Sequence, residues 1–319
     1  MTFFPQGRPS VFFWEMVSLD FCSTLDLTRV VPGQNLVCCM SKNPEISVIL
    51  STYNAPDWLS KTLEGYKVQE FKDFELVIAD DGSGVETKEL IADFANRVDF
   101  PVTHVWQEDD GFQKTKILNK AILASRADYL LMSDGDCIPR SDFLKVHMRY
   151  REPGYFLSGG YHKLPMSISK SIDFSDIQQQ KCFDLGWLKQ RGMRTSIKNL
   201  KFTSREPIRK LLNRLTRTRA SWNGHNASGW KADIMEVNGF DERMQYGGED
   251  RELGERLINY GITSKQIRYS AICIHLDHPR GYKTEASIRK NLSIREETKK
   301  GNKTWTEYGI VKGPKKKCH

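Results

Sequence analysis

The sequence lacks a long apolar run: none of its 319 residues belongs to a stretch approaching the roughly 20 apolar residues of a membrane-spanning helix. We therefore do not expect an integral membrane protein. The first 39 residues also lack the cationic start and clean apolar core of a signal peptide, because Pro5, Glu15 and Asp20 interrupt their aromatic residues. We predict that residues 1–39 are a poorly ordered N-terminal extension and that the chain is cytoplasmic.

Several catalytic motifs are missing as well. The chain has no P-loop, no GxSxG nucleophile elbow and no GxGxxG after its first predicted strand, so kinase, hydrolase and dehydrogenase functions lack support. A sugar-phosphate nucleotidylyltransferase is disfavoured because the Gly-rich, Arg-containing loop of that class is absent. The seven cysteines form no CxxC pair, which predicts reduced thiols and argues against a tetrahedral zinc site.

Acidic residues are scarce in two segments of the chain. The formal net charge is +8, from 48 Lys and Arg against 40 Asp and Glu. Residues 198–219 contain eight basic residues and one acid, and residues 281–319 contain eleven and four. The two segments together carry +14, so the rest of the chain carries −6. An acidic body with basic attachments calls for two explanations.

Apolar runs alternate with helical patterns through the first half of the chain. Strands are predicted at 46–50, 74–79, 102–106 and 129–132, with helices at 57–68, 86–95 and 114–125. This alternation implies right-handed βαβ units and a mostly parallel sheet. We therefore predict a Rossmann-like α/β fold with helices on both faces, in a single large domain.

Polar residues follow each of these four strands. They occupy positions 51–54, 80–83, 107–111 and 134–136. Ligands bind beyond the carboxyl ends of the strands in an open α/β sheet, so the four clusters predict one site.

Two of these clusters are rich in carboxylates. Asp134 and Asp136 flank Gly135 and share one side of an extended segment, which suits a Mg²⁺ or Mn²⁺ ion that faces a phosphate. Asp80 and Asp81 suit hydrogen bonds from the base and ribose of a nucleotide. Ordinary turns with aspartate at their corners are the alternative explanation for both clusters.

The second half holds three further candidate clusters. Gly247-Gly248-Glu249-Asp250 precedes an amphipathic helix, so its acids either begin that helix or project into a cleft, where one could act as a general base. His275 and His278 follow a strand-like segment at 271–274 and are candidate Mn²⁺ ligands, although a lone histidine is more often structural. Residues 222–230 are rich in small, amide and aromatic side chains, which suits a sugar-facing surface or a core turn.

The ordered motifs from Ile46 to about Arg280 resemble the inverting nucleotide-sugar glycosyltransferases of family 2. The second half is similar to the galactosyltransferase-type segment of chondroitin-polymerase-like enzymes. The residues that carry the resemblance are 48–54, 79–83, 110–113, 119–121, 134–139, 237–242 and 247–250. It implies a GT-A type fold and a metal-dependent hexosyl- or N-acetylhexosaminyltransferase. Such an enzyme moves a sugar from a nucleoside diphosphate sugar, with UDP expected, to a glycan or lipid-linked glycan in the synthesis of a polysaccharide such as lipopolysaccharide or capsule.

The resemblance also implies roles for individual residues. Asp250 would be the catalytic base, and Glu249 would hold the donor or acceptor sugar. Mn²⁺ or Mg²⁺ would be bound by Asp134 and Asp136, Asp136 directly, with His275 completing the shell or His278 in its stead.

Nucleotide-sugar contacts would come from a larger set of residues. They are Ser51, Thr52, Asn54, Asp80, Asp81, Lys116, Asp134 and Asn226. Lys116 enters because Leu118 occupies the position where chondroitin-type relatives carry a basic residue, and that departure bears on the diphosphate contact.

We divide the chain after the extension into three parts. These are a nucleotide-sugar-binding half at 40–140, an acceptor-binding and catalytic half at 141–280, and a basic C-terminal tail at 281–319 whose end, from Lys312, is expected to be flexible. The basic segment 198–219 predicts an amphipathic helix from Pro207 onward.

That helix has two interpretations. It either packs on the domain through its leucines or lies on an anionic membrane, at the inner face of the cytoplasmic membrane, with the tail adding to the contact. Nucleic acid is not expected, because no binding motif accompanies the charge. The competing hypothesis for the whole chain is a non-catalytic nucleotide-sugar or nucleic-acid binding protein, which the paired carboxylates disfavour.

Overall fold

The computed structural model describes residues 42–203, 205–279 and 283–315, so the predicted extension 1–39 lies outside the described residues. The strands are β1 Ile46–Thr52, β2 Phe74–Asp80, β3 Val102–Trp106, β4 Tyr129–Asp134, β5 Cys137–Pro139, β6 Tyr155–Ser158, β7 Gly160–Lys163, β8 Ala227–Trp230, β9 Thr263–Gln266 and β10 Ile272–His275. The helices are α1 Pro56–Lys67, α2 Val85–Ala95, α3 Lys114–Ala124, α4 Phe143–Tyr150, α5 Met166–Ser171, α6 Phe174–Gln178, α7 Leu185–Gln190, α8 Leu200–Thr203, α9 Glu206–Leu215, α10 Lys231–Glu236, α11 Glu249–Asn259 and α12 Glu285–Lys300.

The central sheet has seven strands in the order β3-β2-β1-β4-β8-β6-β9, and β5-β10-β7 form a second, smaller sheet. β1 pairs in parallel with β2 on one side and with β4 on the other. The continuous apolar run of β1 suits this central position, because both of its faces are buried. The strand order reverses between β1 and β4, which opens a crevice at their carboxyl ends.

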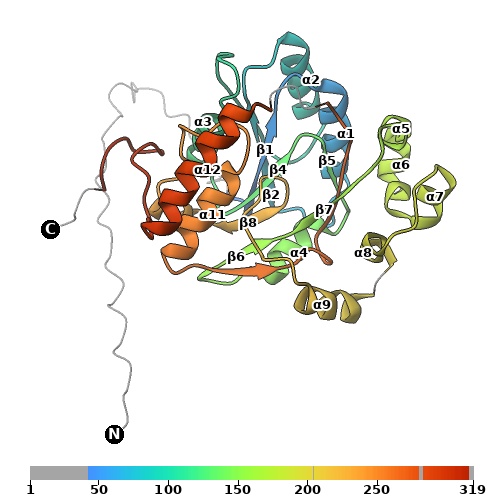
Figure 1. The fold of residues 1–319 in the computed structure, drawn as a ribbon. Coiled ribbons are helices and arrows are strands. Elements are labelled where there is room, and N and C mark those ends of the chain that lie inside the picture. The colour runs from blue at the N-terminus through green and yellow to red at the C-terminus, as the bar shows by residue number, and fades with distance from the viewer. Residues whose placement is uncertain (1–41, 204, 280–282, 316–319) are drawn as a thin grey trace, which may run out of the picture. The chain divides into compact units, whose positions relative to one another are not determined.

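Helices cover both faces of the central sheet (Figure 1). Val48 and Leu50 pack with residues of α1, α2 and α4, whereas Ile49 between them packs with residues of α3, α10 and α11. This alternation follows from the two-residue period of a strand. The predicted α/β fold, its mostly parallel sheet and its two helical layers are therefore confirmed.

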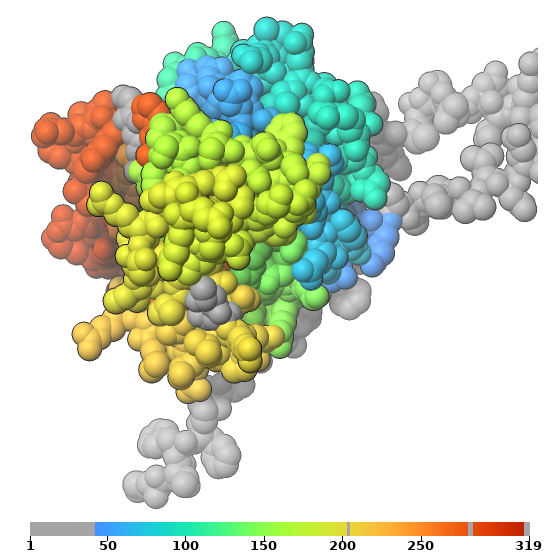
Figure 2. Space-filling view, turned by 90° about the vertical axis from the view of Figure 1, so that its right-hand side faces the viewer, coloured from blue at the N-terminus to red at the C-terminus, as the bar shows by residue number. Residues whose placement is uncertain are grey.

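A lobe of short helices, α5 to α8, follows β7 and lies beyond the small sheet (Figure 1), and its yellow-green atoms face the viewer in Figure 2. Its core contains Ile168, Ile177 and Leu188, which pack with Ile272 and Ile274 of β10. The lobe therefore packs against β10, the strand that ends at the candidate site residue His275.

The prediction of a flexible C-terminal tail is corrected by the structure, because residues 283–315 pack on the domain. α12 lies against α11, with Arg295 Nη2 2.5 Å from Glu255 Oε1. The Asn238 amide donates to the carbonyls of Thr306 and Val311, both at 2.7 Å. These bonds hold the end of the chain on the domain, and Lys312, predicted to be flexible, donates 2.6 Å to the Gly309 carbonyl.

The predicted basic helix forms as α9 and begins next to Pro207, as expected. Three of its apolar side chains face solvent, since Ile208, Leu211 and Leu215 are 49%, 53% and 67% exposed, whereas Leu212 is partly buried. Packing through the leucines is therefore slighter than predicted. Polar contacts also hold α9, because Asn213 bonds Ser270 Oγ and the Tyr269 amide and Glu206 pairs with Arg149. Within the described residues, no helix combines the length and the apolarity required to cross a bilayer.

Candidate functional site

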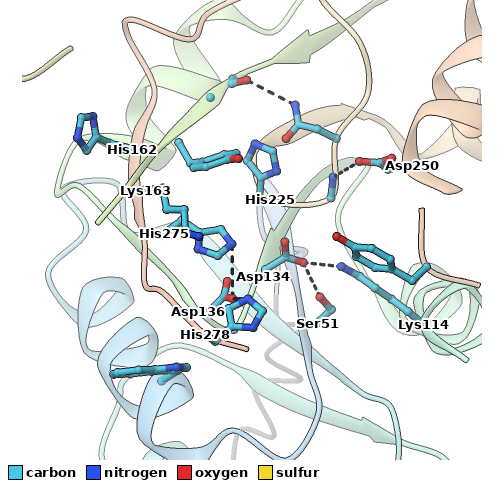
Figure 3. A pocket seen from close by; sticks show the side chains of 18 of the residues that line it. Ser51, Lys114, Asp134, Asp136, His162, Lys163, His225, Asp250, His275 and His278 are labelled. Carbon is cyan, nitrogen blue, oxygen red and sulfur yellow. Dashed lines mark hydrogen bonds and ion pairs between the residues drawn. The ribbon is translucent and has the colours of Figure 1, made fainter. Parts of the chain in front are cut away.

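An open cleft of about 2350 Å³ lies at the carboxyl ends of β1, β2 and β4, where the sequence predicted the site. Ser51, Thr52, Asn54, Asp81, Asp134, Asp136, Glu249, Asp250, His275 and His278 all line it. Figure 3 draws several of these side chains around the same space. Carboxylates 169 positions apart, from Asp81 to Asp250, are thus brought into one cleft by the reversal of strand order.

Asp81 follows β2, and its carboxylate is held by one side-chain donor and one backbone donor. Its carboxylate accepts bonds from Gln107 Nε2 at 2.7 Å and from the Gln113 amide at 2.9 Å. Burial raises the pKa of Asp81 to about 6, against the effect of these donors. Nearby, the buried hydroxyl of Thr52 has no hydrogen-bond partner among the described residues. A buried polar atom of this kind is costly unless a ligand satisfies it.

Asp134, at the end of β4, faces a lysine. Lys114 Nζ lies 2.6 Å from Asp134 Oδ1, and the Ser51 hydroxyl donates to the same oxygen at 2.8 Å. Burial alone would raise the pKa of Asp134, but Lys114 prevails and lowers it. Burial opposes the charge of Lys114 too, yet the carboxylates of Asp134, Glu249 and Asp250 raise its pKa. Both groups are therefore ionised at neutral pH.

Asp136 lies with two histidines that follow β10. Its Oδ2 is 2.8 Å from His278 Nε2 and 3.7 Å from His275 Nε2, and the two rings stack with centroids 5.4 Å apart. Each ring directs its Nδ1 at a carbonyl, His275 at that of Leu276 and His278 at that of Pro279. A carbonyl only accepts, so each Nδ1 carries a proton, and Nε2 is the ring nitrogen that each histidine turns toward Asp136.

This donor set fits a divalent cation. Two imidazole nitrogens and a carboxylate oxygen converge, which leaves lone pairs facing one another unless a proton or a metal lies between them. Backbone carbonyls that fix the tautomer are a common second layer around metal-binding histidines. Asp136, Cys137 and His275 also lie within ligand distance of one another. Burial raises the pKa of the Cys137 thiol well above its ordinary value, so it stays protonated and is a poor ligand.

Glu249 and Asp250 begin α11 and point into the cleft. Gly247 and Gly248 both have positive φ, at 118° and 91°, which only glycine adopts easily. This turn lets Glu249 Oε2 accept from the Gly247 amide at 2.9 Å, while Asp250 Oδ2 accepts from the Gly224 amide at 3.2 Å. Burial raises the pKa of Asp250, and burial together with the charge of Asp250 raises that of Glu249 to about 7.

Gly224 joins the two groups of carboxylates. While its amide holds Asp250, a Cβ at this position would lie 3.4 Å from Lys114 Nζ and 3.8 Å from Asp134 Oδ1. The Asp250 carboxylate and the Lys114–Asp134 pair therefore lie on either side of one glycine, where a Cβ would be in van der Waals contact with the pair.

Three predicted contact residues do not reach the cleft. Asp80 is buried and bonds the Ser83 amide and His104 Nε2, so it closes the turn after β2. Lys116 is exposed and does not line the cleft. Asn226 is completely buried and bonds His147 Nε2 and the carbonyls of Gly160 and Ala271. Asp80 and Asn226 thus have partners within the protein where a ligand was expected, and Lys116 faces solvent.

Sequence reasoning missed three residues that do line the cleft. Lys114 takes the place expected for Lys116, and His225 takes that expected for Asn226. Burial lowers the pKa of His225 to about 4, so its ring is neutral at physiological pH. Tyr161 packs edge-on to His225 with centroids 4.5 Å apart and adds an aromatic wall. No motif marked these residues, and only the adjacent predictions pointed to them.

Comparisons with known proteins assign both halves of the chain. Residues 47–159 match glycosyl transferase family 2, and residues 218–279 match the family described as the N-terminal domain of galactosyltransferase. Chondroitin synthase of Escherichia coli is 23% identical over 318 residues, covering 88% of this chain and 44% of the relative. Hyaluronan synthase of Pasteurella multocida is 25% identical over 273 residues, covering 78% of this chain and 26% of the relative. The chain thus spans less than half the length of these two relatives.

Solved structures share the fold. A mannosyltransferase from Pyrobaculum calidifontis, in complex with GDP-Man and Mn²⁺, superposes with a TM-score of 0.51 at 17% identity, covering 76% of this chain and 59% of the other. S. aureus TarS 1–349, in complex with UDP-GlcNAc, superposes with a TM-score of 0.52 at 15% identity, covering 78% and 64%. The chain therefore has a GT-A fold, with a match to glycosyl transferase family 2 in its first half and a match to the galactosyltransferase domain in its second half.

Proposed function

We propose that this protein is an inverting, metal-dependent glycosyltransferase that moves a sugar from a nucleoside diphosphate sugar to a glycan acceptor. One observation carries the proposal: the cation-seeking group of Asp136, His275 and His278 shares a cleft with the raised-pKa carboxylates Glu249 and Asp250. A nucleotide-sugar binding protein without catalysis has no need for that second pair.

The donor half of the proposal rests on the ends of β1 and β2. We propose that Asp81, which lines the cleft, accepts a hydrogen bond from the N–H of a base such as uracil, and that the unsatisfied Thr52 hydroxyl contacts the nucleoside. We assign UDP as the nucleotide. The bound UDP-GlcNAc of TarS supports a donor of this class, although GDP-Man in the mannosyltransferase argues for testing other bases.

The metal would be held by Asp136, His275 and His278, and Mn²⁺ suits two imidazoles better than Mg²⁺. When bound, a divalent cation offsets the charge that develops on the departing diphosphate. Lys114 adds a fixed positive charge in the same cleft and keeps Asp134 ionised. Ser51 holds Asp134 in place from the other side.

Asp250 is proposed as the base. It takes the proton of an acceptor hydroxyl while that oxygen forms a bond to the anomeric carbon. The bond from that carbon to the phosphate oxygen breaks on the opposite face, and the nucleoside diphosphate leaves with the electron pair, so the configuration inverts. The Gly224 and Arg251 amides hold the two oxygens of Asp250 in one orientation, and Glu249 faces a sugar hydroxyl.

A membrane location for the acceptor is supported by α9. Its exposed Ile208, Leu211 and Leu215 are accompanied by Lys210 and Arg214, the pattern of a helix that lies on an anionic bilayer. We therefore propose a lipid-linked glycan acceptor at a cytoplasmic membrane surface and a role in building a cell-surface polysaccharide.

The experiment is a calorimetric titration of the protein with UDP, UDP-GlcNAc, UDP-glucose and GDP-mannose, each in Mn²⁺ and in EDTA, with donor hydrolysis measured in parallel. We expect a UDP-sugar to bind and hydrolyse only with the metal. Asp136→Ala should abolish the metal dependence, whereas Asp93→Ala, which removes an exposed carboxylate of α2, should not. Equal binding of all donors in EDTA, or no binding at all, would overturn the proposal.

A further inference from the structure

The wall of the cleft that is formed by lining residues from 158 to 223 and from 266 to 269 is basic. Arg194, Lys198, Lys201, Arg219 and Arg268 line it, and the described lining residues from 158 to 223 and from 266 to 269 include no Asp or Glu. Among the described residues, no carboxylate pairs with any of these five cations. The cations nearer the strand ends differ, because Lys114 pairs with Asp134 and Lys163 with Asp277.

Two of these cations converge on the backbone of β7. A Cβ at Gly160 would lie 3.2 Å from Lys201 Nζ and 3.5 Å from Arg268 Nε. Lys201 is only 5% exposed, and its ammonium donates to the Tyr161 carbonyl at 2.7 Å. Burial, helped by the charges of Arg268 and Lys198, lowers the pKa of Lys201 to about 8. Burying a cation beside other cations is unfavourable, so the arrangement calls for an anion that offsets it.

The position of this group separates it from the metal side of the cleft. In the pairing of β7 with β10, Lys163 is opposite His275 and Gly160 is opposite Ile272. Three residues along a strand correspond to about 10 Å, which is one to two sugar rings rather than the length of a phosphate. A diphosphate held at Asp136 therefore would not reach Gly160, whereas an acceptor that extends from Asp250 across the cleft could.

We propose that the group of Lys201, Arg268 and Lys198 around Gly160 is an acceptor subsite that binds an anionic group of the glycan, a carboxylate or a phosphate one to two residues from the attacked hydroxyl. The inference rests on the proposed function and adds the chemical class of the acceptor. Arg268 is suited to bidentate contact with either anion. Arg194 and Arg219, which have no carboxylate partner in the described part of the chain, add to the positive field of the cleft and attract the same ligand.

The test uses the full-length protein saturated with Mn²⁺ and UDP, titrated by calorimetry with three probes. They are a disaccharide that ends in glucuronic acid, its neutral methyl ester, and a disaccharide linked to a short prenyl diphosphate. We expect at least one anionic probe to bind about tenfold more tightly than the ester and to weaken as salt rises. The first and third probes distinguish a carboxylate from a phosphate.

Variants locate the interaction. Arg268→Gln and Lys198→Gln should each weaken the preferred anionic probe by about tenfold and leave its methyl ester and UDP affinity unchanged. Lys88→Gln removes an exposed lysine of α2 outside the cleft and should have no effect, which controls for net charge. Lys201 is left intact because its substitution could disturb folding.

Two results would overturn the inference. Both anionic probes could bind no more tightly than the ester to the wild-type protein and to all variants, which would remove the anionic contact. Alternatively, Arg268→Gln could lose UDP affinity, which would assign the cations to the donor. Failure of the proposed function has a different signature, because wild-type protein would then not bind UDP with Mn²⁺ at all.

Discussion

The two walls of the cleft differ in charge and in how the fold completes them. On the donor wall, the charged groups already have partners within the protein: Lys114 holds Asp134, and the Gly224 amide holds Asp250. On the opposite wall, Lys198 and Arg268 have no carboxylate partner among the described residues. A wall whose charges are already balanced is organised for catalysis before substrate arrives, and a wall of unpaired cations is completed only by its ligand.

The donor wall itself contains two kinds of carboxylate. Asp134 has a lowered pKa because Lys114 outweighs its burial, while burial raises the pKa of Asp250 and of Glu249. The first remains an anion at any physiological pH, and the second pair can take up a proton. Groups whose environments move their pKa in opposite directions divide the roles of fixed charge and proton acceptor.

The largest effect is expected from Asp250→Asn. This change removes the proposed base but keeps the side-chain oxygen that the Gly224 amide can bond. Transfer should fall by about a thousandfold, the middle of the range for general base catalysis. Donor affinity should change little, because the nucleotide contacts lie at the ends of β1 and β2. Single-turnover transfer and UDP titration measure the two quantities.

Glu249→Gln serves as the comparison, since it alters the neighbouring carboxylate with an equal change of charge. We expect a smaller loss in this variant, expressed in the KM for the sugar. A variant at 250 that transfers at the wild-type rate would end the assignment of the base.

A second, smaller loss is expected from Lys114→Gln. The variant leaves the partly buried Asp134 without its cation, so the pKa of Asp134 rises and the donor wall loses a fixed charge. Use of the donor should drop by about a hundredfold in kcat/KM, the order expected when one preorganised electrostatic contact is removed. Lys114→Arg should recover part of it.

Lys116→Gln is the matched control, since this lysine is exposed two positions further along α3 and does not line the cleft. Equal losses in the two glutamine variants would mean that the diphosphate contact predicted from the sequence was correct.

These two lysines show what sequence reasoning could supply. The apolar runs at 46–50, 74–79 and 129–132 predicted the strands, because buried parallel strands are apolar on both faces. The ends of those strands then predicted where the cleft lies. Which lysine enters it depends on helix rotation: residues two apart differ by about 200° around a helix, and only the packed structure fixes that angle.

The other misses have the same origin. His225 and Asn226 are adjacent, and at the start of β8 adjacent side chains point to opposite sides, one to the cleft and one to His147. Asp80 and Asp81 divide likewise at the end of β2. The sequence located each pair of neighbouring residues, and only tertiary contacts determine which residue of the pair lines the cleft. α12 escaped prediction because its charged composition resembles a solvated tail, although Arg295 and Glu255 join it to α11.

A third, still smaller effect concerns pH. As the pH falls through about 7, protonation begins at the Glu249–Asp250 pair, and the rate of transfer should decrease by about tenfold per pH unit once Asp250 is protonated. Glu249→Gln should move this decrease to lower pH, because the ionised form of Asp250 no longer has a carboxylate neighbour. A pH–rate profile from 5 to 8 for both proteins measures the shift. A flat wild-type profile would contradict the assignment.

Stability should move in the opposite direction. The pKa of Glu249 is higher in the folded protein than its ordinary value, so the folded state binds the proton more tightly. Its contribution to the free energy of unfolding therefore increases as the pH falls from about 7 toward the ordinary range near 4.3, and it is lost as the pH rises through 7. Thermal unfolding of wild type and Glu249→Gln at pH 5 and pH 7.5 separates this contribution from other groups.

The smallest effect on chemistry should come from α9, which lies outside the donor wall. Replacing Ile208, Leu211 and Leu215 by serine removes three exposed apolar side chains without breaking the bonds of Asn213. We expect transfer to a water-soluble acceptor to stay unchanged and binding to vesicles with anionic lipid to fall severalfold, since apolar burial and basic charge both contribute to such binding. Leu123→Ser, on an exposed face of α3, is the control for lost apolar surface. Vesicle flotation measures the difference. Equal binding by the wild type, the α9 variant and Leu123→Ser would contradict a membrane contact through α9, and the basic wall of the cleft would then be the only proposed feature that selects the acceptor.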